Sequence, residues 1–402
     1  MSKIIVQKYG GSSMADVAKI GLVADKVVAA KRAGHDVVVV VSAMGKTTDE
    51  LVALARKISG ADGSGHDHPA SSPPRRELDM LVSTGERVSM ALLSIAIQAR
   101  GLEAISFTGS QSGILTNDRH FDARIIEVRP HRIEDELARG KIVIVAGYQG
   151  MSYKREITTL GRGGSDTTAI ALAAALGAER CEIYSDVDGV YSADPRVVDD
   201  PVHLPVLDLA TLQEMAEAGA KVINAQAVEW ARRAKITIHA RKTADFAPAA
   251  LETVATESPP LGRVRAVVGL DNVVHVRVGR DFRRFLDLAA VLEAPVVDVA
   301  GTVDEATCVL PLLNVPDWER CRARLVAELS SVTLKERCAT VSVVGSELTS
   351  MHAVPTFLST LEDAGASPIA FVSGSLRLTA VIASEKLAVA QRALHAIFVR
   401  ES

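Results

Sequence analysis

Residues 3–16 read Lys-Ile-Ile-Val-Gln-Lys-Tyr-Gly-Gly-Ser-Ser-Met-Ala-Asp, an apolar run followed by two glycines and two hydroxyl side chains. The apolar run predicts a buried strand over Lys3–Tyr9. From Ser13 the sequence resembles a capping box, with Asp16 in place of glutamate, that opens a long amphipathic helix ending at Gly34. A strand, a glycine turn and a helix in this order predict the start of a parallel α/β sheet.

The alternation of strand and helix continues through roughly the first 240 residues. Further strands are expected at Asp36–Ser42, Ala104–Phe107, Lys141–Ala146, Arg180–Ser185 and Lys235–Ala240, with helices over 47–59 and 85–100 and a polar loop over 60–76. This pattern is typical of a largely parallel sheet covered on both faces. Ligands are then expected in the loops at the carboxyl ends of the strands.

The pattern changes beyond a predicted linker at 246–263, which contains Glu-Ser-Pro-Pro-Leu-Gly. Two rounds of strand, helix, strand, strand and helix follow, and they predict ferredoxin-like α+β modules over 264–335 and 336–402. The expected strands are 265–278, 296–300, 307–312, 339–344, 368–373 and 376–383, and the expected helices are 282–292, 317–329, 351–364 and 385–399.

Composition narrows the functional classes. The 402 residues are 48% hydrophobic, with 45 Lys and Arg against 49 Asp and Glu, which excludes wholesale disorder and argues against a nucleic-acid coat or a polybasic membrane anchor. The longest aliphatic run, Val37–Val41, is too short to span a bilayer, and the N-terminus has no signal-peptide pattern. We therefore expect a cytoplasmic protein with neither nucleic-acid nor membrane partners.

Several patterns that suggest other chemistry are rejected. The four cysteines form no C-x-x-C pair, and Cys181, in a predicted strand, is interpreted as a buried thiol. His66-Asp67-His68 is interpreted as a solvated loop rather than a metal site. Gly45-Lys46-Thr47 lacks the first glycine of a P-loop, and the sixth position of Gly161–Asp166 is not the glycine of a dinucleotide fingerprint.

Three other segments carry more specific chemistry. Lys8–Ser12 places a cation and two glycines at the end of a strand, where backbone N–H groups bind phosphate. Thr158–Thr168 brings three more glycines, Arg162 and Asp166 to a helix start, although Ser165 and Asp166 would also serve as helix caps. Tyr184–Arg196 supplies acids, a tyrosine and an arginine after a strand, a composition that also suits a solvated loop.

Together these segments resemble the aspartate kinases of the amino-acid kinase family. The matching blocks are Lys8–Ser13, Val41–Gly45, Thr47–Glu50, Ser83–Arg87, Phe107–Gln111, Gly147–Gly150, Thr159–Asp166 and Ser185–Arg196. The resemblance implies a three-layer α/β kinase domain over residues 1–245. It also implies transfer of phosphate from Mg-ATP to the side-chain carboxylate of L-aspartate, the entry step to lysine, threonine and methionine.

The resemblance assigns roles to individual residues. The catalytic pair is Lys8, which stabilises the transferring phosphoryl group, and Asp166, which organises Lys8. The ATP-binding residues are Lys8, Gly10, Gly11, Ser42, Ser185, Asp186, Tyr191, Arg196 and Lys221. The substrate-binding residues are Thr47, Thr48, Asp49, Glu86, Arg162, Gly163, Gly164 and Ser165. No side chain is expected to ligate a metal directly, and Asp188 and Asp194 are interpreted as loop-turn residues.

Two substrate contacts also follow from chemistry. Arg162 has the planar fork that grips a carboxylate, and Glu86 would accept the α-ammonium of the amino acid. The alternative for each is half of a surface ion pair. Two other functions stay open: a degenerate homologue that binds amino acids without turnover, and a kinase of another small carboxylate or phosphate.

After the kinase domain, aspartate kinases carry two ACT modules that bind lysine or threonine, and 264–402 has the matching size and element order. The sequence departs from the family at 278–284, which lacks the usual Pro-Gly turn, and at 294–298, where Ala-Pro-Val-Val-Asp replaces Asn-Ile-Asn. The region is therefore interpreted either as an allosteric sensor or as a module that has kept only dimerisation. A homodimer through the ACT modules or assembly with a second ACT subunit is expected.

Overall fold

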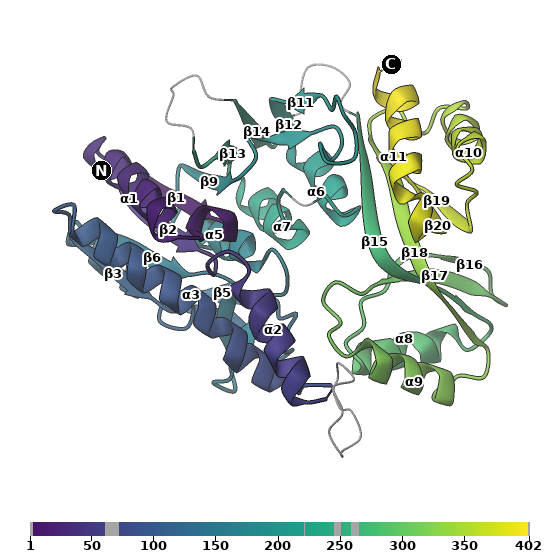
Figure 1. Cartoon of the computed structure of the whole chain (residues 1–402), viewed down its shortest axis with the longest axis horizontal. Helices are drawn as coiled ribbons and strands as arrows, with labels where there is room; N and C mark the ends of the chain where they lie inside the picture. The colour runs from purple at the N-terminus through teal and green to yellow at the C-terminus, as the bar shows by residue number, and fades with distance from the viewer. Residues whose placement is uncertain (1–2, 61–71, 221, 245–250, 259–264, 401–402) are drawn as a thin grey trace. The chain divides into compact units, whose positions relative to one another are not determined.

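The computed structural model describes residues 3–60, 72–220, 222–244, 251–258 and 265–400 (Figure 1). The chain divides into two compact units. The first holds the described residues of Met1–Val190, Pro205–Leu212 and Val222–Pro259, and the second holds those of Tyr191–Leu204, Gln213–Lys221 and Pro260–Ser402.

An eight-stranded sheet forms the centre of the first unit, in the order β12-β14-β13-β9-β1-β2-β6-β3. Its strands are β1 (Ile4–Tyr9), β2 (Asp36–Val41), β3 (Ala104–Phe107), β6 (Ile142–Ala146), β9 (Arg180–Ser185), β12 (Val206–Asp208), β13 (Ile238–Lys242) and β14 (Glu252–Thr256). β13 and β14 are antiparallel, and the other neighbouring pairs are parallel. The prediction of a largely parallel sheet is confirmed.

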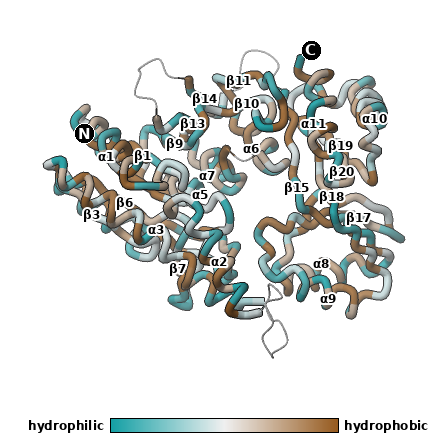
Figure 2. The backbone as a smooth tube through the Cα atoms, in the orientation of Figure 1, coloured by the Kyte–Doolittle hydropathy of each residue, from teal (hydrophilic) through white to brown (hydrophobic). Residues whose placement is uncertain are grey.

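Helices cover both faces of this sheet. They are α1 (Val17–Arg32), α2 (Thr47–Ile58), α3 (Arg75–Gln98), α4 (His131–Ala138), α5 (Gly164–Ala175) and α7 (Ala225–Ala234), while α6 (Leu209–Glu217) runs from the first unit into the second. α1 and α3 share a core with alternate residues of the central strands, such as Val23 with Val39 and Ile144. α5 contacts β1, β2, β9 and α7. The three-layer α/β prediction is confirmed, and Figure 2 shows how apolar residues follow strands such as β1 and β6.

Three local predictions were wrong. The residue that caps α1 is Asp16, whose carboxylate accepts from the Lys19 N–H, and not Ser13, which lies in a preceding 3-10 turn. The predicted linker contains β14, because Thr253 and Ala255 alternate into the sheet. The helix expected from about residue 85 begins at Arg75, so part of the predicted loop is helical.

A four-stranded sheet was missed altogether. Its strands are β5 (Ile125–Val128), β4 (Ile114–Thr116), β7 (Gln149–Ser152) and β8 (Ile157–Thr159), in that order. Each strand has three or four residues, too few for a period of two to be recognised. This sheet places Gln149 against Gly109, in the loop after β3, and Thr159 against Tyr148, which follows β6.

The second unit is built on a six-stranded antiparallel sheet in the order β16-β17-β15-β18-β20-β19. Its strands are β15 (Arg265–Val278), β16 (Val297–Gly301), β17 (Ala306–Pro311), β18 (Val332–Gly345), β19 (Ala370–Ser373) and β20 (Arg377–Ala383), and its helices are α8 (Phe282–Val291), α9 (Trp318–Glu328), α10 (Ala353–Asp363) and α11 (Leu387–His395). The predicted order of elements is confirmed, and two separate cores lie under α8 with α9 and under α10 with α11.

The two long strands each contribute to both cores. Val267 of β15 belongs to the core of α10 and α11, whereas Val274 of the same strand belongs to the core of α8 and α9. β18 likewise contributes to both cores. Leu334 packs against the core of α8 and α9, and Ala339 belongs to the core of α10 and α11. The predicted module boundary at 335/336 therefore falls inside one continuous strand.

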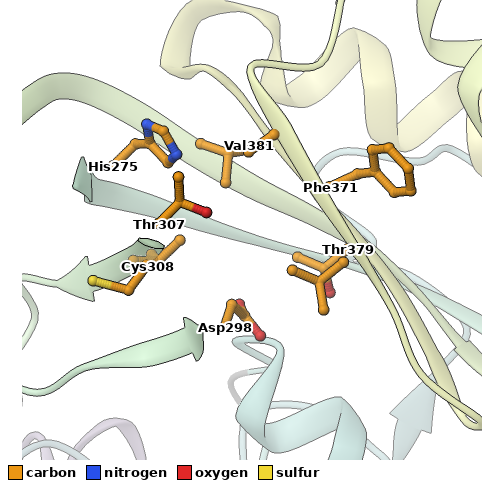
Figure 3. A pocket seen from close by; sticks show the side chains of 10 residues that line it. His275, Asp298, Thr307, Cys308, Phe371, Thr379 and Val381 are labelled. Atoms are coloured by element: carbon orange, nitrogen blue, oxygen red, sulfur yellow. The ribbon is translucent and has the colours of Figure 1, made fainter. Parts of the chain in front are cut away.

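A shallow pocket lies on this sheet (Figure 3). Its empty volume is about 250 Å³, a figure that includes space open to solvent. Its lining residues are His275, Asp298, Thr307, Cys308, Val309, Ala370, Phe371, Val372, Thr379 and Val381. The carboxylate of Asp298 accepts from Arg377 at 2.8 Å. His275 is buried, and no hydrogen-bond partner of its Nε2 lies in the described part of the chain.

One described helix, α3, is long and apolar enough to cross a membrane by length and composition alone. Half of its most apolar window is buried inside the fold, and Leu93 and Ile97 belong to the core of the first unit. A core helix meets the same criteria, and α3 has that role here.

Candidate active site

The ends of the central parallel strands bring a buried ion pair to one edge of the first unit. Lys8 lies near the end of β1, and its Nζ is 2.7 Å from Oδ1 of Asp166 in the first turn of α5. The two side chains are only 11% and 6% exposed. A charged pair taken this far out of water needs close geometry, and its electrostatic effect on a bound anion is stronger than at the surface.

The glycine turn after β1 is tightly packed. A Cβ on Gly11 would lie 3.0 Å from the carbonyl oxygens of both Ala43 and Gly45, and a Cβ on Gly10 would lie 3.5 Å from Lys8 Nζ. The Gly45 N–H also donates to the Gly11 carbonyl at 3.0 Å. The turn therefore has little room for a side chain at Gly11, and it joins the loops that follow β1 and β2. Its approach to phosphate stays a prediction.

The N-terminus of α5 is shaped by glycines. Gly163 has φ +76°, and a Cβ there would lie 2.8 Å from Cβ of Asn224. A Cβ on Gly164 would lie 2.6 Å from Leu160. The adjacent Ser165 is 6% exposed and packs against Gly147. These contacts explain why the turn needs glycine beyond any capping role.

Asn224 is a positioning residue that the sequence analysis missed. Its side-chain N–H donates to the Arg162 carbonyl at 2.8 Å, while its side-chain oxygen caps α7 through the Gln226 N–H and accepts from Thr167. An asparagine directly before an amphipathic run is a helix-start pattern, which would have identified the cap but not the link to Arg162.

Glu86, in α3, is 3% exposed. Its Oε1 accepts from the Ala43 N–H at 3.1 Å, whereas its Oε2 has no partner among the described residues. Burial raises the pKa of Glu86 to about 7. A buried carboxylate with one unsatisfied oxygen is destabilising in isolation and marks a place for a cationic group.

Tyr148, which the sequence analysis did not single out, lies within electrostatic reach of both Glu86 and Arg162. It is buried at φ +68°, and its backbone N–H donates to Thr168 at 3.2 Å. Its hydroxyl is hydrogen-bonded to Thr159. Burial raises the pKa of Tyr148 well above its ordinary value, the charge of Glu86 raises it further, and the charge of Arg162 lowers it. Both charges therefore lie within electrostatic reach of one phenol.

The guanidinium of Arg162 is bound by Asp49, with Nη2 at 2.7 Å from Oδ1. The side chains are 60% and 55% exposed, so this pair is weak and readily exchanged for another carboxylate. At the start of α2, Thr47 donates its hydroxyl to the Met44 carbonyl at 2.7 Å, and Thr48 is half-buried beside it.

The remaining predicted nucleotide residues are divided between the units. Ser42 follows β2, and its N–H donates to the Tyr9 carbonyl. Ser185 is the last residue of β9, and the exposed Asp186 follows it. The Ser185 carbonyl accepts from the hydroxyl of Thr243, which in turn bonds Ser13 at 2.6 Å.

The other half of this loop belongs to the second unit. Tyr191 and Arg196 lie there, and Lys221 lies outside the described residues. The Arg196 side chain donates to Asp194 at 2.9 and 2.8 Å, and its backbone N–H donates to the same carboxylate. Asp194 therefore holds a loop turn, as predicted.

Comparisons with known proteins now bear on this geometry. Residues 3–241 match the model of the amino acid kinase family. An aspartokinase from Mycolicibacterium smegmatis is 40% identical over 98% of this chain and 96% of its own, and one from Corynebacterium glutamicum is 38% identical over the same shares. The chain belongs to the amino acid kinase family, among the aspartokinases.

Solved structures agree with this placement. E. coli aspartokinase III in complex with aspartate and ADP, in its R-state, matches with a TM-score of 0.86 at 25% identity, covering 98% of this chain and 99% of that one. The same enzyme in complex with lysine and aspartate, in its T-state, matches with a TM-score of 0.68 at 26% identity, covering 99% and 100%. The likeness to aspartokinases extends over both units.

Proposed function

We propose that the chain transfers the γ-phosphoryl group of ATP to the side-chain carboxylate of L-aspartate, giving 4-phospho-L-aspartate and ADP, the first step toward lysine, threonine and methionine. The observation that carries the proposal is the buried Lys8–Asp166 pair beside the Gly10-Gly11 turn. Full-length aspartokinase relatives support it, as does a structural neighbour that holds aspartate and ADP.

The chemistry requires positioning and charge neutralisation. A side-chain carboxylate is ionised at neutral pH and needs no general base. One of its oxygens attacks the γ-phosphorus, and the bond from that phosphorus to the bridging oxygen of ADP breaks. Lys8 neutralises charge on the transferring group, and Asp166, 2.7 Å away, fixes the direction of the ammonium.

We assign the ends of the amino acid to two residues. Glu86, with its unsatisfied oxygen, accepts the α-ammonium, and Arg162 exchanges Asp49 for a substrate carboxylate. The other proposed substrate-binding residues are Thr47, Thr48, Asp49, Gly163, Gly164 and Ser165. Tyr148 lies within electrostatic reach of both charges.

The nucleotide is proposed to bind at the ends of β1, β2 and β9 and the loop that follows. Its residues are Lys8, Gly10, Gly11, Ser42, Ser185, Asp186, Tyr191, Arg196 and Lys221. In the described part of the chain, no three His, Cys, Asp or Glu side chains come together as a metal site. Mg²⁺ commonly binds through substrate phosphates, so we propose that it enters the site bound to ATP. We assign no protein side chain to it as a ligand.

An acceptor panel tests the proposed function. ADP release is followed with L-aspartate, glutamate, N-acetylglutamate and uridylate as acceptors. Of these four acceptors, we expect only aspartate to be phosphorylated. The acceptor must offer an ammonium to Glu86 and a carboxylate to Arg162 within one short amino acid. Faster turnover with another acceptor would assign the site to a different kinase, and aspartate binding without ADP release would make the chain a degenerate homologue.

The raised pKa of Glu86 predicts a pH-dependent KM for aspartate. Only ionised Glu86 attracts the α-ammonium, so KM is expected to rise as pH falls through about 7, approaching tenfold per pH unit. Replacement by glutamine should raise KM at pH 8 and flatten the profile. Steady-state kinetics between pH 6 and pH 8.5 measure both effects.

The raised pKa of Glu86 also makes the stability of the fold depend on pH. Because the folded-state pKa lies above the ordinary 4.5, the folded protein binds more protons between pH 4.5 and about 7, and Glu86 reduces stability as pH rises through that window. Glu86→Gln should therefore unfold at a higher temperature than the wild type at pH 8 without ligand. Glu77→Gln, at an exposed site on the same helix, is the matched control. A pH profile of the KM for aspartate that is unchanged in Glu86→Gln would remove Glu86 from the substrate site.

We propose residues 1–245 as the catalytic domain and residues 264–335 and 336–402 as two ACT-like regulatory modules, which share the strands β15 and β18. Lysine is the favoured effector because a structural neighbour holds it, and threonine is the alternative.

Sheet-edge strands β16 and β19 expose Val297, Val299 and Phe371, which suit a homodimer interface. A cytoplasmic location is proposed. Kinase activity with lysine, threonine and methionine, singly and in pairs, separates a sensor from a module that has kept only dimerisation.

A further inference from the structure

The segment Tyr191–Leu204, which continues the proposed nucleotide loop, belongs to the second unit. Ser192 is fully buried in it, and every polar group of this residue is engaged. Its N–H donates to the Val202 carbonyl at 2.8 Å, and its carbonyl accepts from Val267 of β15 at 2.6 Å. Its hydroxyl oxygen accepts from the Val202 N–H at 2.8 Å.

The hydroxyl of Ser192 makes one more bond, to a histidine of the C-terminal helix. Nε2 of His395, in the last turn of α11, lies 2.8 Å from Ser192 Oγ, and His395 is 1% exposed. Burial, reinforced by the charge of Arg400, lowers the pKa of His395. The imidazole is therefore neutral at physiological pH. The hydroxyl oxygen accepts from the Val202 N–H, and a neutral imidazole whose Nε2 carries no proton accepts the hydroxyl proton of Ser192.

Two arginines hold the same segment further along. Arg392 of α11 donates to the Val197 carbonyl at 3.3 Å. Arg400, just beyond α11, donates to the Asp200 carbonyl at 3.3 Å and to its carboxylate at 3.0 Å. One helix and its continuation thus contact the segment at three points, on both sides of Arg196 in the sequence.

We infer that His395 is a positioning residue for nucleotide binding: its bond to Ser192 fixes the segment that carries Tyr191 and Arg196, so the placement of α11 sets the affinity for the nucleotide. This inference rests on the proposed function, which assigns those two residues to ATP. The buried hydrogen bond connects α11 directly to a segment that we propose binds the nucleotide. A ligand that moved α11 would change the KM for ATP before it changed the chemical step.

The test is His395→Phe in the full chain, which keeps a ring and removes the acceptor. We expect KM for ATP and the Kd for ADP to rise together by about five- to tenfold, the size of one lost buried hydrogen bond. KM for aspartate and kcat at saturating ATP should stay within about twofold. His395→Gln, whose side-chain oxygen can accept from Ser192, should recover most of the ADP affinity. ADP binding is measured by calorimetry, which needs no turnover.

Leu394→Val is the matched control, since Leu394 lies in the core under α11 and perturbs the same helix without removing the bond. An equal loss of ADP affinity in Leu394→Val, or unchanged affinity in His395→Phe, would overturn the inference. If His395→Phe fails to fold, Arg400→Met is tested instead, since the Arg400 side chain is half-exposed. We expect this variant to lose about twofold in ADP affinity, and an unchanged ADP affinity would contradict the inference. If the wild type binds ADP but does not phosphorylate aspartate, the proposed reaction is wrong. The ADP titrations of the wild type and His395→Phe still test the role of His395 in that case.

Discussion

Replacing Lys8 with alanine is expected to abolish aspartate-dependent release of ADP while the chain still folds. The Lys8 side chain is 11% exposed and lies at the end of β1, beside the glycine turn that we propose binds phosphate. Loss of one well-placed charged donor at a transferring group typically costs about 3–4 kcal/mol, or roughly 10²–10³ in kcat. Coupled detection of ADP, with both substrates varied, measures the loss and separates kcat from the two KM values.

The variant also leaves Asp166 buried without its partner, which typically costs about 3–5 kcal/mol of stability. Lys8→Ala combined with Asp166→Asn removes that charge, and it should regain stability without regaining turnover. Lys31→Ala breaks a partly buried ion pair with Asp36 in the same unit and serves as the control for stability alone. Turnover near the wild-type rate in Lys8→Ala would remove Lys8 from the mechanism.

Local patterns predicted the elements of this fold well where residues themselves determine them. The valine run of β2, the glycine that ends α1 and the order of strands and helices in the second unit are all present as expected. What the sequence does not reveal depends on distant partners. β14 is a strand because β12 and β13 flank it, and β18 is continuous because β15 pairs along its whole length.

The site follows the same division. Lys8, Asp166 and the glycines stand in contiguous motifs, and the structure brings them together. The roles of Tyr148 and Asn224 depend on contacts across 11 and 62 residues, to Thr159 and Arg162, which no local pattern specifies. The assignment of Tyr191 and Arg196 to the second unit is likewise a tertiary fact. The sequence therefore predicts the candidate catalytic groups, and the fold shows which residues position them.

Arg162→Ala is expected to raise the KM for aspartate by roughly 10- to 100-fold and to leave the KM for ATP within about twofold, because a charge-assisted hydrogen bond contributes about 1.5–3 kcal/mol. Arg162→Lys keeps the charge but loses the planar fork, so it should recover only part of the loss. Initial rates over a matrix of aspartate and ATP concentrations measure both constants.

Asp49 supplies the internal control for Arg162, because without substrate the two side chains bind each other at 2.7 Å. A substrate carboxylate has to displace Asp49, and an exposed pair of this kind resists by less than about 1 kcal/mol. Asp49→Ala should therefore change the KM for aspartate by no more than about fivefold, far less than Arg162→Ala. If Asp49→Ala is the more damaging change, Asp49 is the principal substrate contact of the pair and Arg162 serves to hold it. If Arg162→Ala raises the KM for ATP alone, the arginine belongs to the nucleotide half of the site.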